Sequence, residues 1–421
     1  MKSVRREDGV PSRPEFGQSR ILVRAYLAVA ALLSVYAWAV FVLSFRHDGL
    51  IGPRYNAPGT DFMVYHTAAR LFRQGGIPLL TQGAAFTARL NRDFAGWLTS
   101  PLPPHPWVYP PPFLLLLVPF GRLPFAIAYP GFLAATFAAA VAGAWCVAAG
   151  GVRRVAWIGV LALAPATAID AVVGQNALLT AGILLGGFGL LRRSPLAGGA
   201  VLGAMSYKPQ FAMMVPVALI ALGQWRALAA AAAGAALLAV LSLALLGTAI
   251  WRDWLAWLFA GGDDYATWLE WGRSWGVGVS ACAAWLGLPP PAAQALQVLA
   301  AIGAAGAVYS AFRRPLVDER RLVVLLGGTV LAAPHVLSYD LVLLAAAAAL
   351  LFRHVAATPS AFAPPLLLLL WAAPLLGPPR ASPAGFAVPL LAAALVAYAL
   401  SANGGLAVPA VEPVASEAGG A

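Results

Sequence analysis

Carboxylates are scarce in this chain of 421 residues, so each one is a candidate for acid–base chemistry. Asp61 opens the segment "GTDFMVYHTAARLFRQGG", which has the apolar spacing of a helix and also carries Tyr65, His66 and Arg70. A carboxylate placed here can take a proton from a hydroxyl group as a general base. It can also be a helix cap and nothing more, at the N-cap or in the first turn, kept ionised by backbone N–H groups.

Three further motifs place polar side chains beside apolar runs. They supply Gln175 and Asn176 in "GQN", Lys208 in "MSYKPQF", and His335, Tyr339 and Asp340 in "APHVLSYDLVLL". A charged group at membrane depth costs about 2.5–3.5 kcal/mol on insertion scales, which makes it a functional hypothesis by default. The alternatives are that Lys208 snorkels to the interface, and that His335 and Asp340 form a structural pair across a helix turn.

Composition assigns these residues to a membrane protein. Hydrophobic residues make up 61% of the chain and charged residues 10%, and several segments of about 15 to 25 residues hold no charge. Backbone amides in lipid must bond within their own segment, and the runs lack the alternation of a β-barrel strand. The sequence therefore predicts an all-α polytopic membrane protein.

About twelve segments fit transmembrane helices, several of them shorter than the ~20 residues of a perpendicular span. They cover residues 21–45, 125–149, 155–171, 176–191, 195–207, 209–224, 227–247, 291–312, 322–336, 338–352, 361–377 and 384–401. We expect residues 1–20 to be a basic cytoplasmic N-terminus, 21–401 one transmembrane domain, and 402–421 a disordered tail.

Arginine clusters between these segments give an orientation by the positive-inside rule. The cytoplasmic clusters are Arg153/Arg154, Arg192/Arg193, Arg226, Arg313/Arg314, Arg320/Arg321 and Arg353. Both termini then lie in the cytoplasm, and the outer side holds the "GQN" motif and two large loops, residues 46–124 and 248–290. Asp61, Lys208 and His335 share that outer side.

The proline-containing segment "YPPPFLLLLVPFGRLP", residues 109–124, would invert this orientation if it crossed the membrane. We therefore predict a re-entrant or interfacial broken helix that begins with Tyr109.

Other classes are disfavoured. The net charge of +11 comes from short clusters between apolar runs, which indicates topology rather than nucleic-acid binding. No GxxxxGK[ST] motif occurs and no inner loop is long enough for a nucleotide-binding domain, so cytoplasmic ATP-driven chemistry is not expected.

The order of the motifs resembles glycosyltransferase family 87, integral-membrane enzymes of the GT-C superfamily. The resemblance rests on "DFMVYHTAARLFRQGGIPL", "YPPPFLLLLVPFGRLP", "GQNALLTAGILL", "AGGAVLGAMSYKPQF" and "APHVLSYDLVLL", and it runs from about residue 21 to 352. It implies a GT-C-type fold in the cell membrane of a bacterium, with an extracytoplasmic active site. It also implies a polyprenyl-phosphate sugar as donor, mannose in the first place, and inversion at the anomeric carbon. The family's candidate base maps onto Asp61, and a lipid-phosphate site onto Lys208 and His335.

The residues are compatible with that chemistry. Inverting transfer needs one carboxylate to deprotonate the acceptor hydroxyl, whereas hydrolysis by the usual route needs a second one, and nothing in the sequence pairs with Asp61. Lys208, His335 and Arg273 offer charge to a leaving phosphate, so we predict neither a cofactor nor a metal site. Asp263 and Asp264 leave a metal open, although adjacent loop carboxylates are more often simply solvated.

The predicted substrate-binding residues are Lys208, His335, Tyr65, His66, Arg70, Tyr109, Gln175, Asn176, Tyr339 and Asp340. Tyr65, His66 and Arg70 either line an acceptor groove or face the headgroups. The tryptophans of residues 248–290 are either membrane anchors or a surface for a sugar or a prenyl chain.

We therefore expect an inverting hexosyltransferase that acts on a glycolipid or glycan acceptor and has the bilayer, but no nucleic acid, as partner. The alternatives are a flippase or transporter of lipid-linked sugars without transferase activity, and a GT-C enzyme with a pentose or aminosugar lipid donor.

Overall fold

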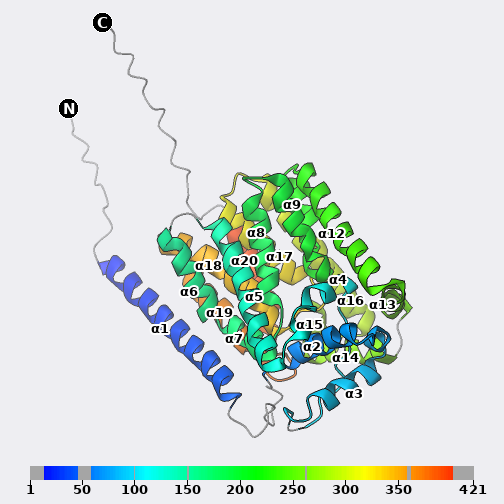
Figure 1. The fold of residues 1–421 in the computed structure, drawn as a ribbon. Coiled ribbons are helices and arrows are strands. Elements are labelled where there is room, and N and C mark those ends of the chain that lie inside the picture. Colours follow the sequence, from blue (N-terminus) through cyan, green and yellow to red (C-terminus); the bar gives the residue numbers. More distant parts are fainter. Residues whose placement is uncertain are drawn as a thin grey trace, which may run out of the picture.

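The computed structural model describes residues 14–45, 58–98, 100–148, 151–260, 263–357 and 362–401, and these are helices and connections without a strand (Figure 1). The all-α prediction is confirmed for this part of the chain. The predicted tail, residues 402–421, and most of the predicted cytoplasmic N-terminus, residues 1–13, lie outside the described residues.

Five helices are long and apolar enough to cross a membrane, and a bent pair makes a sixth. They are α1 (Pro14–Leu43), α5 (Phe125–Val147), α12 (Trp225–Leu246), α16 (Pro290–Arg313) and α20 (Ala387–Leu400), which η6 (Pro383–Phe386) extends; the bent pair is α6 (Gly151–Leu163) and α7 (Pro165–Val173).

Shorter helices fill the remaining predicted segments. They are α8 (Ala177–Leu190), α9 (Pro195–Gly203) with η3 (Ala204–Tyr207), α10 (Pro209–Ala212) with α11 (Met214–Ala221), α17 (Asp318–Ala332), η4 (Ser338–Leu341) with α18 (Val342–Ala357), and α19 (Ala363–Ala372) with η5 (Ala373–Leu375). A helix thus lies in each of the twelve predicted segments, while the number that cross the membrane stays a prediction.

The predicted helical segment over residues 155–171 is divided into two helices. The segment bends by 59° between α6 and α7, because Pro165 has no N–H to continue the α6 hydrogen-bond ladder and restricts the residue before it. The bend matters for the site, since α7 leads directly into the "GQN" turn.

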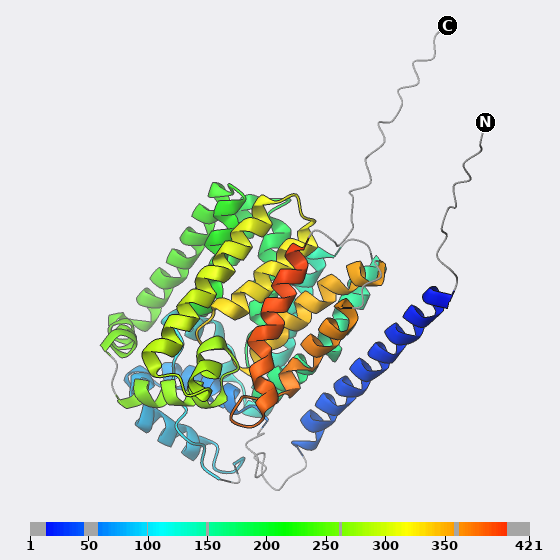
Figure 2. The same cartoon turned by 180° about the vertical axis from the view of Figure 1, so that it is seen from behind.

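Several arginine-containing turns gather at one end of the bundle. Arg192, between α8 and α9, lies 3.1 Å from the carboxylate of Asp318 at the start of α17. Arg320 donates to the backbone oxygen of Ser401, 2.8 Å away, just beyond α20. The turns with Arg192 and Arg320 and the end of α20, which are all predicted to be cytoplasmic, therefore lie together. This agrees with the positive-inside interpretation, and Figures 1 and 2 show this end of the bundle at the top.

The two predicted outer loops fold into short helices at the other end (Figure 1). The first holds α2 (Thr60–Arg73), η1 (Ile77–Thr81), α3 (Gly83–Asp93), α4 (Pro111–Leu117) and η2 (Phe120–Arg122), and the second holds α13 (Thr248–Ala260), α14 (Asp263–Trp275) and α15 (Val279–Trp285). The 109–124 segment is broken as predicted, because α4 has seven residues and cannot span a bilayer at 1.5 Å per residue.

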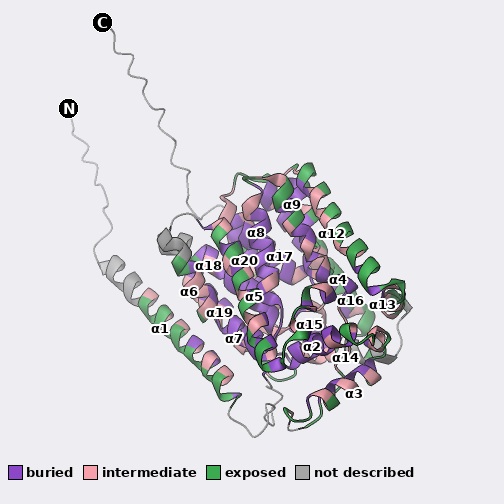
Figure 3. Ribbon diagram, viewed as in Figure 1, coloured by how far each residue is buried: buried purple, intermediate pink, exposed green. Residues whose placement is uncertain are grey.

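Burial separates the helices into a centre and a periphery. Residues of α8, α17 and α18 are largely buried, whereas α1, α12 and α16 expose apolar faces on the outside of the bundle (Figure 3). Such faces suit contact with lipid. α8 is held especially close to α5, since a Cβ on Gly182 would lie 2.4 Å from the backbone oxygen of Ala139.

Candidate active site

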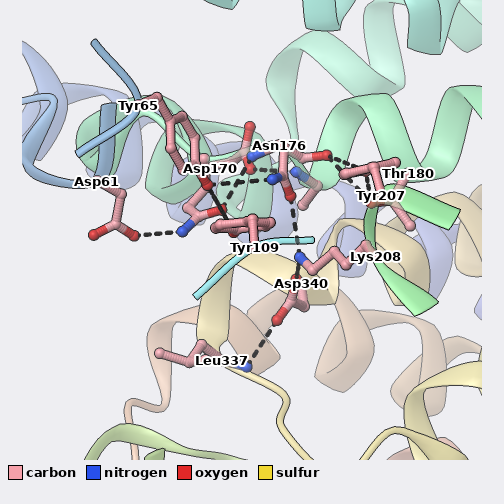
Figure 4. A network of polar contacts seen from close by, with 12 residues as sticks. Asp61, Tyr65, Tyr109, Asp170, Asn176, Thr180, Tyr207, Lys208, Leu337 and Asp340 are labelled. Carbon is pink, nitrogen blue, oxygen red and sulfur yellow. Dashed lines mark hydrogen bonds and ion pairs between the residues drawn. The ribbon is translucent and has the colours of Figure 1, made fainter. Parts of the chain in front are cut away.

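Five segments that are distant in sequence bring polar side chains together near the outer-loop end (Figure 4). They are the start of α2, the residues just before α4, the turn between α7 and α8, the break between η3 and α10, and η4. Each is a helix end or an interruption, where the backbone leaves regular geometry and a side chain can point into the bundle.

Asp61 lies in the first turn of α2 and is bonded to Gln175. The Gln175 Nε2 atom donates to Asp61 Oδ2 over 2.6 Å. The N-cap residue is Gly59, and no side chain caps this end, so the expectation that backbone N–H groups hold the carboxylate is wrong. The Asp61 Oδ1 atom has no hydrogen-bond partner among the described residues, and Asp61 lines the cavity described below.

Two tyrosines fix the orientation of the Gln175 amide. Tyr65 donates its hydroxyl to Gln175 Oε1 over 2.7 Å, and Tyr109 lies 3.1 Å from the same oxygen. Because a hydroxyl donor requires an oxygen acceptor, the amide nitrogen must face Asp61. The arrangement therefore presents one carboxylate oxygen of Asp61 to a donor and leaves the other one available.

Asn176 connects this group to a buried ion pair. It donates from Nδ2 to the Tyr65 hydroxyl over 3.2 Å and accepts at Oδ1 from Lys208 Nζ over 3.1 Å. Lys208 Nζ also donates to Asp340 Oδ1 over 2.6 Å, and Asp340 Oδ2 accepts from the backbone of Leu337. One continuous network thus runs from Asp61 to Asp340.

This network excludes the two structural alternatives for its charged residues, namely a snorkelling Lys208 and a pair of His335 with Asp340. Lys208 is 4% exposed and ion-paired, so it does not snorkel to an interface. Asp340 pairs with Lys208 rather than with His335. Removing one partner of such a buried pair strongly destabilises the folded protein, because the remaining charge is left without compensation.

A cavity of about 850 Å³ lies against the network. The predicted site residues that line it are Asp61, Tyr65, Tyr109, Gln175, Lys208, His335, Tyr339 and Asp340. Its remaining wall comes from the outer loops, α16 and the break between η3 and α10, and it includes four of the loop tryptophans, Trp254, Trp257, Trp271 and Trp285. Asn176 is buried behind this lining and acts through its neighbours.

Two predicted residues point elsewhere. His66 is buried among the rings of Phe62, Phe94 and Phe125, and its Nε2 lies 2.9 Å from the backbone oxygen of Leu123. Burial lowers the pKa of this imidazole. Neither His66 nor Arg70 belongs to the cavity lining, because both lie on other faces of α2 than Asp61 and Tyr65.

The environment sets the protonation of two cavity groups. Burial raises the pKa of the Asp61 carboxyl, although positive charge at His105, the bond from Gln175 and the charge of Lys208 act in the opposite direction. A raised pKa makes Asp61 a stronger base once it is ionised. Burial lowers the pKa of His335 to about 4, so this imidazole is neutral at pH 7.

Sequence reasoning missed two residues of this region. His105 lines the cavity, and its Nδ1 lies 2.7 Å from the backbone oxygen of Pro103, which leaves Nε2 for other contacts. The available signal was a histidine in the proline-rich stretch "PLPPHPW" just before Tyr109. The second residue is Asp170, five positions before Gln175, whose Oδ1 accepts from the backbone of Ala177. Among the described residues, no group of three or more His, Cys, Asp or Glu side chains could hold a metal.

Comparison with known proteins gives one family match. The model of glycosyltransferase family 87 matches residues 107–338, which is more than half of the chain and includes the "GQN" turn, Lys208 and His335. No curated protein and no solved structure matches the chain. The chain therefore belongs to glycosyltransferase family 87 and is a membrane glycosyltransferase.

Proposed function

We propose that the enzyme transfers a hexose, mannose in the first place, from a polyprenyl-phosphate sugar to an extracytoplasmic glycolipid or glycan, with inversion. The observation that carries this proposal is Asp61, whose Oδ1 is unpartnered among the described residues at a cavity that also contains Lys208. Family membership supplies the reaction class.

The reaction is a single displacement in which Asp61 is the base. Asp61 removes the proton of the acceptor hydroxyl, and the acceptor oxygen forms a bond to the anomeric carbon from the face opposite the phosphate. The bond between that carbon and the phosphate oxygen breaks, and its electron pair leaves with polyprenyl phosphate. The proton on Asp61 then passes to solvent, which restores the carboxylate.

The other carboxylates of the cavity wall are engaged. Asp340 is bonded to Lys208 and to the Leu337 backbone, and Glu270 lies 3.6 Å from Arg273. A mechanism with a second, unengaged carboxylate as nucleophile or acid therefore has less support than transfer with one base.

Lys208 is suited to the leaving phosphate. An ammonium group has three N–H donors, and two are used by Asn176 and Asp340, which leaves one for a phosphate oxygen. His335, neutral at pH 7, offers a hydrogen bond rather than a charge. We assign these two residues to the donor phosphate, and the cavity tryptophans to the sugar or the prenyl chain.

The arginines support an extracytoplasmic location of the site. The turns with Arg192 and Arg320 lie at the end of the bundle opposite α2 and α14 (Figure 1). If the arginine end is cytoplasmic, as the positive-inside rule requires, the cavity faces the other side of the membrane.

The test uses the full chain in lipid nanodiscs with radiolabelled polyprenyl-phosphate mannose and candidate glycolipid acceptors. We expect transfer that Asp61→Asn abolishes. Asp93→Asn is the matched control, because Asp93 is ion-paired with Arg89 on α3 and lies outside the cavity lining. Donor movement across vesicles without any transfer would support the flippase instead, and activity with only a pentose or aminosugar donor would support the other alternative.

A further inference from the structure

A buried carboxylate, Asp170, stands behind the "GQN" turn (Figure 4). Asp170 is in α7 and is 0% exposed. Its Oδ1 accepts from the backbone N–H of Ala177, the first residue of α8, over 3.0 Å. Its backbone oxygen accepts from the N–H groups of Gly174 and Gln175, 2.9 and 3.0 Å away. A single residue therefore fixes the backbone on both sides of Gln175 and Asn176.

The second carboxylate oxygen of Asp170 makes this choice of residue unusual. Oδ2 is buried and has no hydrogen-bond partner in the part of the chain that the structure describes. A buried, unsatisfied acidic oxygen is costly, and a helix end can be capped by serine, threonine or asparagine without an acid. The bond to Ala177 at the start of α8 favours an anion at this place, but it leaves the cost of the unsatisfied oxygen, so the side chains that the turn presents bear on the role of Asp170.

The turn is pressed against the helix that carries Asp61. The Gly59 N–H donates to the Val172 backbone oxygen over 2.6 Å. At Gly174, which has φ +75°, an added Cβ would lie 2.6 Å from the Cβ of Phe62. With the bond from Gln175 to Asp61, these contacts make the position of the catalytic carboxylate depend on the turn.

We propose that Asp170 is a positioning residue for sugar transfer, which holds the turn so that Gln175 orients Asp61 and Asn176 orients Lys208. The inference rests on the proposed function, because it assigns a role within that reaction. Asp170 does not belong to the cavity lining and acts only through its two neighbours. The feature that matters is the acceptor oxygen at Ala177.

The test compares variants in the transfer assay across pH. Asp170→Leu and Asp170→Ala remove the acceptor, and we expect kcat to fall about 10- to 100-fold, as for a small displacement of a catalytic group, with a smaller change in the donor KM. The acid limb of kcat/KM should move to higher pH, because the bond from Gln175 lowers the pKa of Asp61. His105, Lys208 and Asp340, which also act on Asp61, are unchanged in these variants. Asp170 itself interacts electrostatically with Asp61, and loss of its charge alone would move the limb to lower pH, so a shift to higher pH reports the bond from Gln175.

Two further variants separate positioning from folding. Asp170→Asn keeps an oxygen acceptor for Ala177 and removes only the charge, so it should remain within about threefold of the wild-type rate, with an acid limb that does not move to higher pH. Thr167→Val is the control, since Thr167 is buried on the same helix but bonds to Leu161 and not to the turn. Thr167→Val should leave kcat and the acid limb of kcat/KM unchanged.

Size-exclusion profiles and thermal unfolding in detergent accompany each assay. We expect Asp170→Leu to remain folded, because it also removes the unsatisfied oxygen. Wild-type rate and acid limb in the folded Leu or Ala variant would overturn the proposal. Loss of folded protein in both variants would also overturn it, because the role of Asp170 would then be purely structural. An Asp170→Asn enzyme as impaired as Asp170→Leu would overturn it as well. Absence of transfer in the wild type would instead refute the proposed function, before any variant is compared.

Discussion

Gln175 and Asp61 are 114 positions apart in sequence, and the amide nitrogen of Gln175 lies 2.6 Å from the Asp61 carboxylate. Tyr65 and Tyr109 hold the amide oxygen on its other side, so this contact is fixed from both ends. The base of the proposed reaction is therefore oriented by the "GQN" turn rather than by its own helix.

Replacing Gln175 by leucine should change both the rate and its pH dependence. Asp61 must be ionised to act as a base, so activity is lost as the pH falls through its pKa. Burial already raises this pKa and the Gln175 bond lowers it, so Gln175→Leu should move the acid limb of kcat/KM to higher pH. We also expect kcat near neutral pH to fall about tenfold or more, because the carboxylate loses its orientation.

Gln82→Leu is the control for that substitution. The side chain of Gln82 donates to the backbone oxygen of Pro78 at an exposed position, and Gln82→Leu should leave the pH profile unchanged. An unshifted acid limb in an active Gln175→Leu enzyme would contradict the role of Gln175.

Removing both charges of the Lys208–Asp340 ion pair should restore the stability that is lost when Lys208 alone is removed, but it should not restore activity. Lys208→Met alone leaves a buried carboxylate uncompensated, and we expect a loss of about 3–5 kcal/mol in the free energy of unfolding. The double variant Lys208→Met/Asp340→Leu removes both charges and should recover most of that loss. Neither variant should transfer sugar, because the donor phosphate has no ammonium group to bind.

Thermal unfolding in detergent and the transfer assay together check this prediction. The exposed pair Arg252 and Asp253 offers a control, since removing either partner should cost less than about 1 kcal/mol. Recovery of transfer in the double variant would show that Lys208 serves only to neutralise Asp340.

Close packing of α5 against α8 should be needed to place the "GQN" turn. A Cβ at Gly182 would lie 2.4 Å from the Ala139 backbone oxygen, whereas a Cβ at Gly303 on α16 would meet nothing within 4 Å. Gly182→Ala should therefore destabilise the protein by about 1–3 kcal/mol or more and reduce transfer, while Gly303→Ala should do neither. Equal unfolding temperatures for the two variants would contradict this packing.

Much of the site could be predicted from sequence because its residues conflict with their surroundings. Lys208 and Asp340 are charges within apolar runs, and Gln175 and Asn176 interrupt another run, so each was recognisable as an exception. Their partners were not, since hydrogen bonds between segments depend on packing that a single sequence does not encode. His66 was wrongly expected to bind substrate. It lies on α2 like Asp61, but its position on the helix directs its side chain into an aromatic cluster. The bend before Pro165 was missed because the apolar pattern continues through it.

The orientation of the bundle can be tested independently of the reaction. The carboxyl end of α8 leads into the turn with Arg192 and Arg193, whereas residue 100 follows α3 in the first outer loop. Because arginine-rich turns stay in the cytoplasm, alkaline phosphatase fused after residue 100 should be active and a fusion after residue 190 inactive. In a fusion after residue 194, which retains both arginines, replacing Arg192 and Arg193 by glutamine should raise activity, since the charge bias would weaken locally. Equal activity of the two unmodified fusions would mean that the helices between them cross the membrane an even number of times, and the assignment of the cavity to the extracytoplasmic side would then be withdrawn.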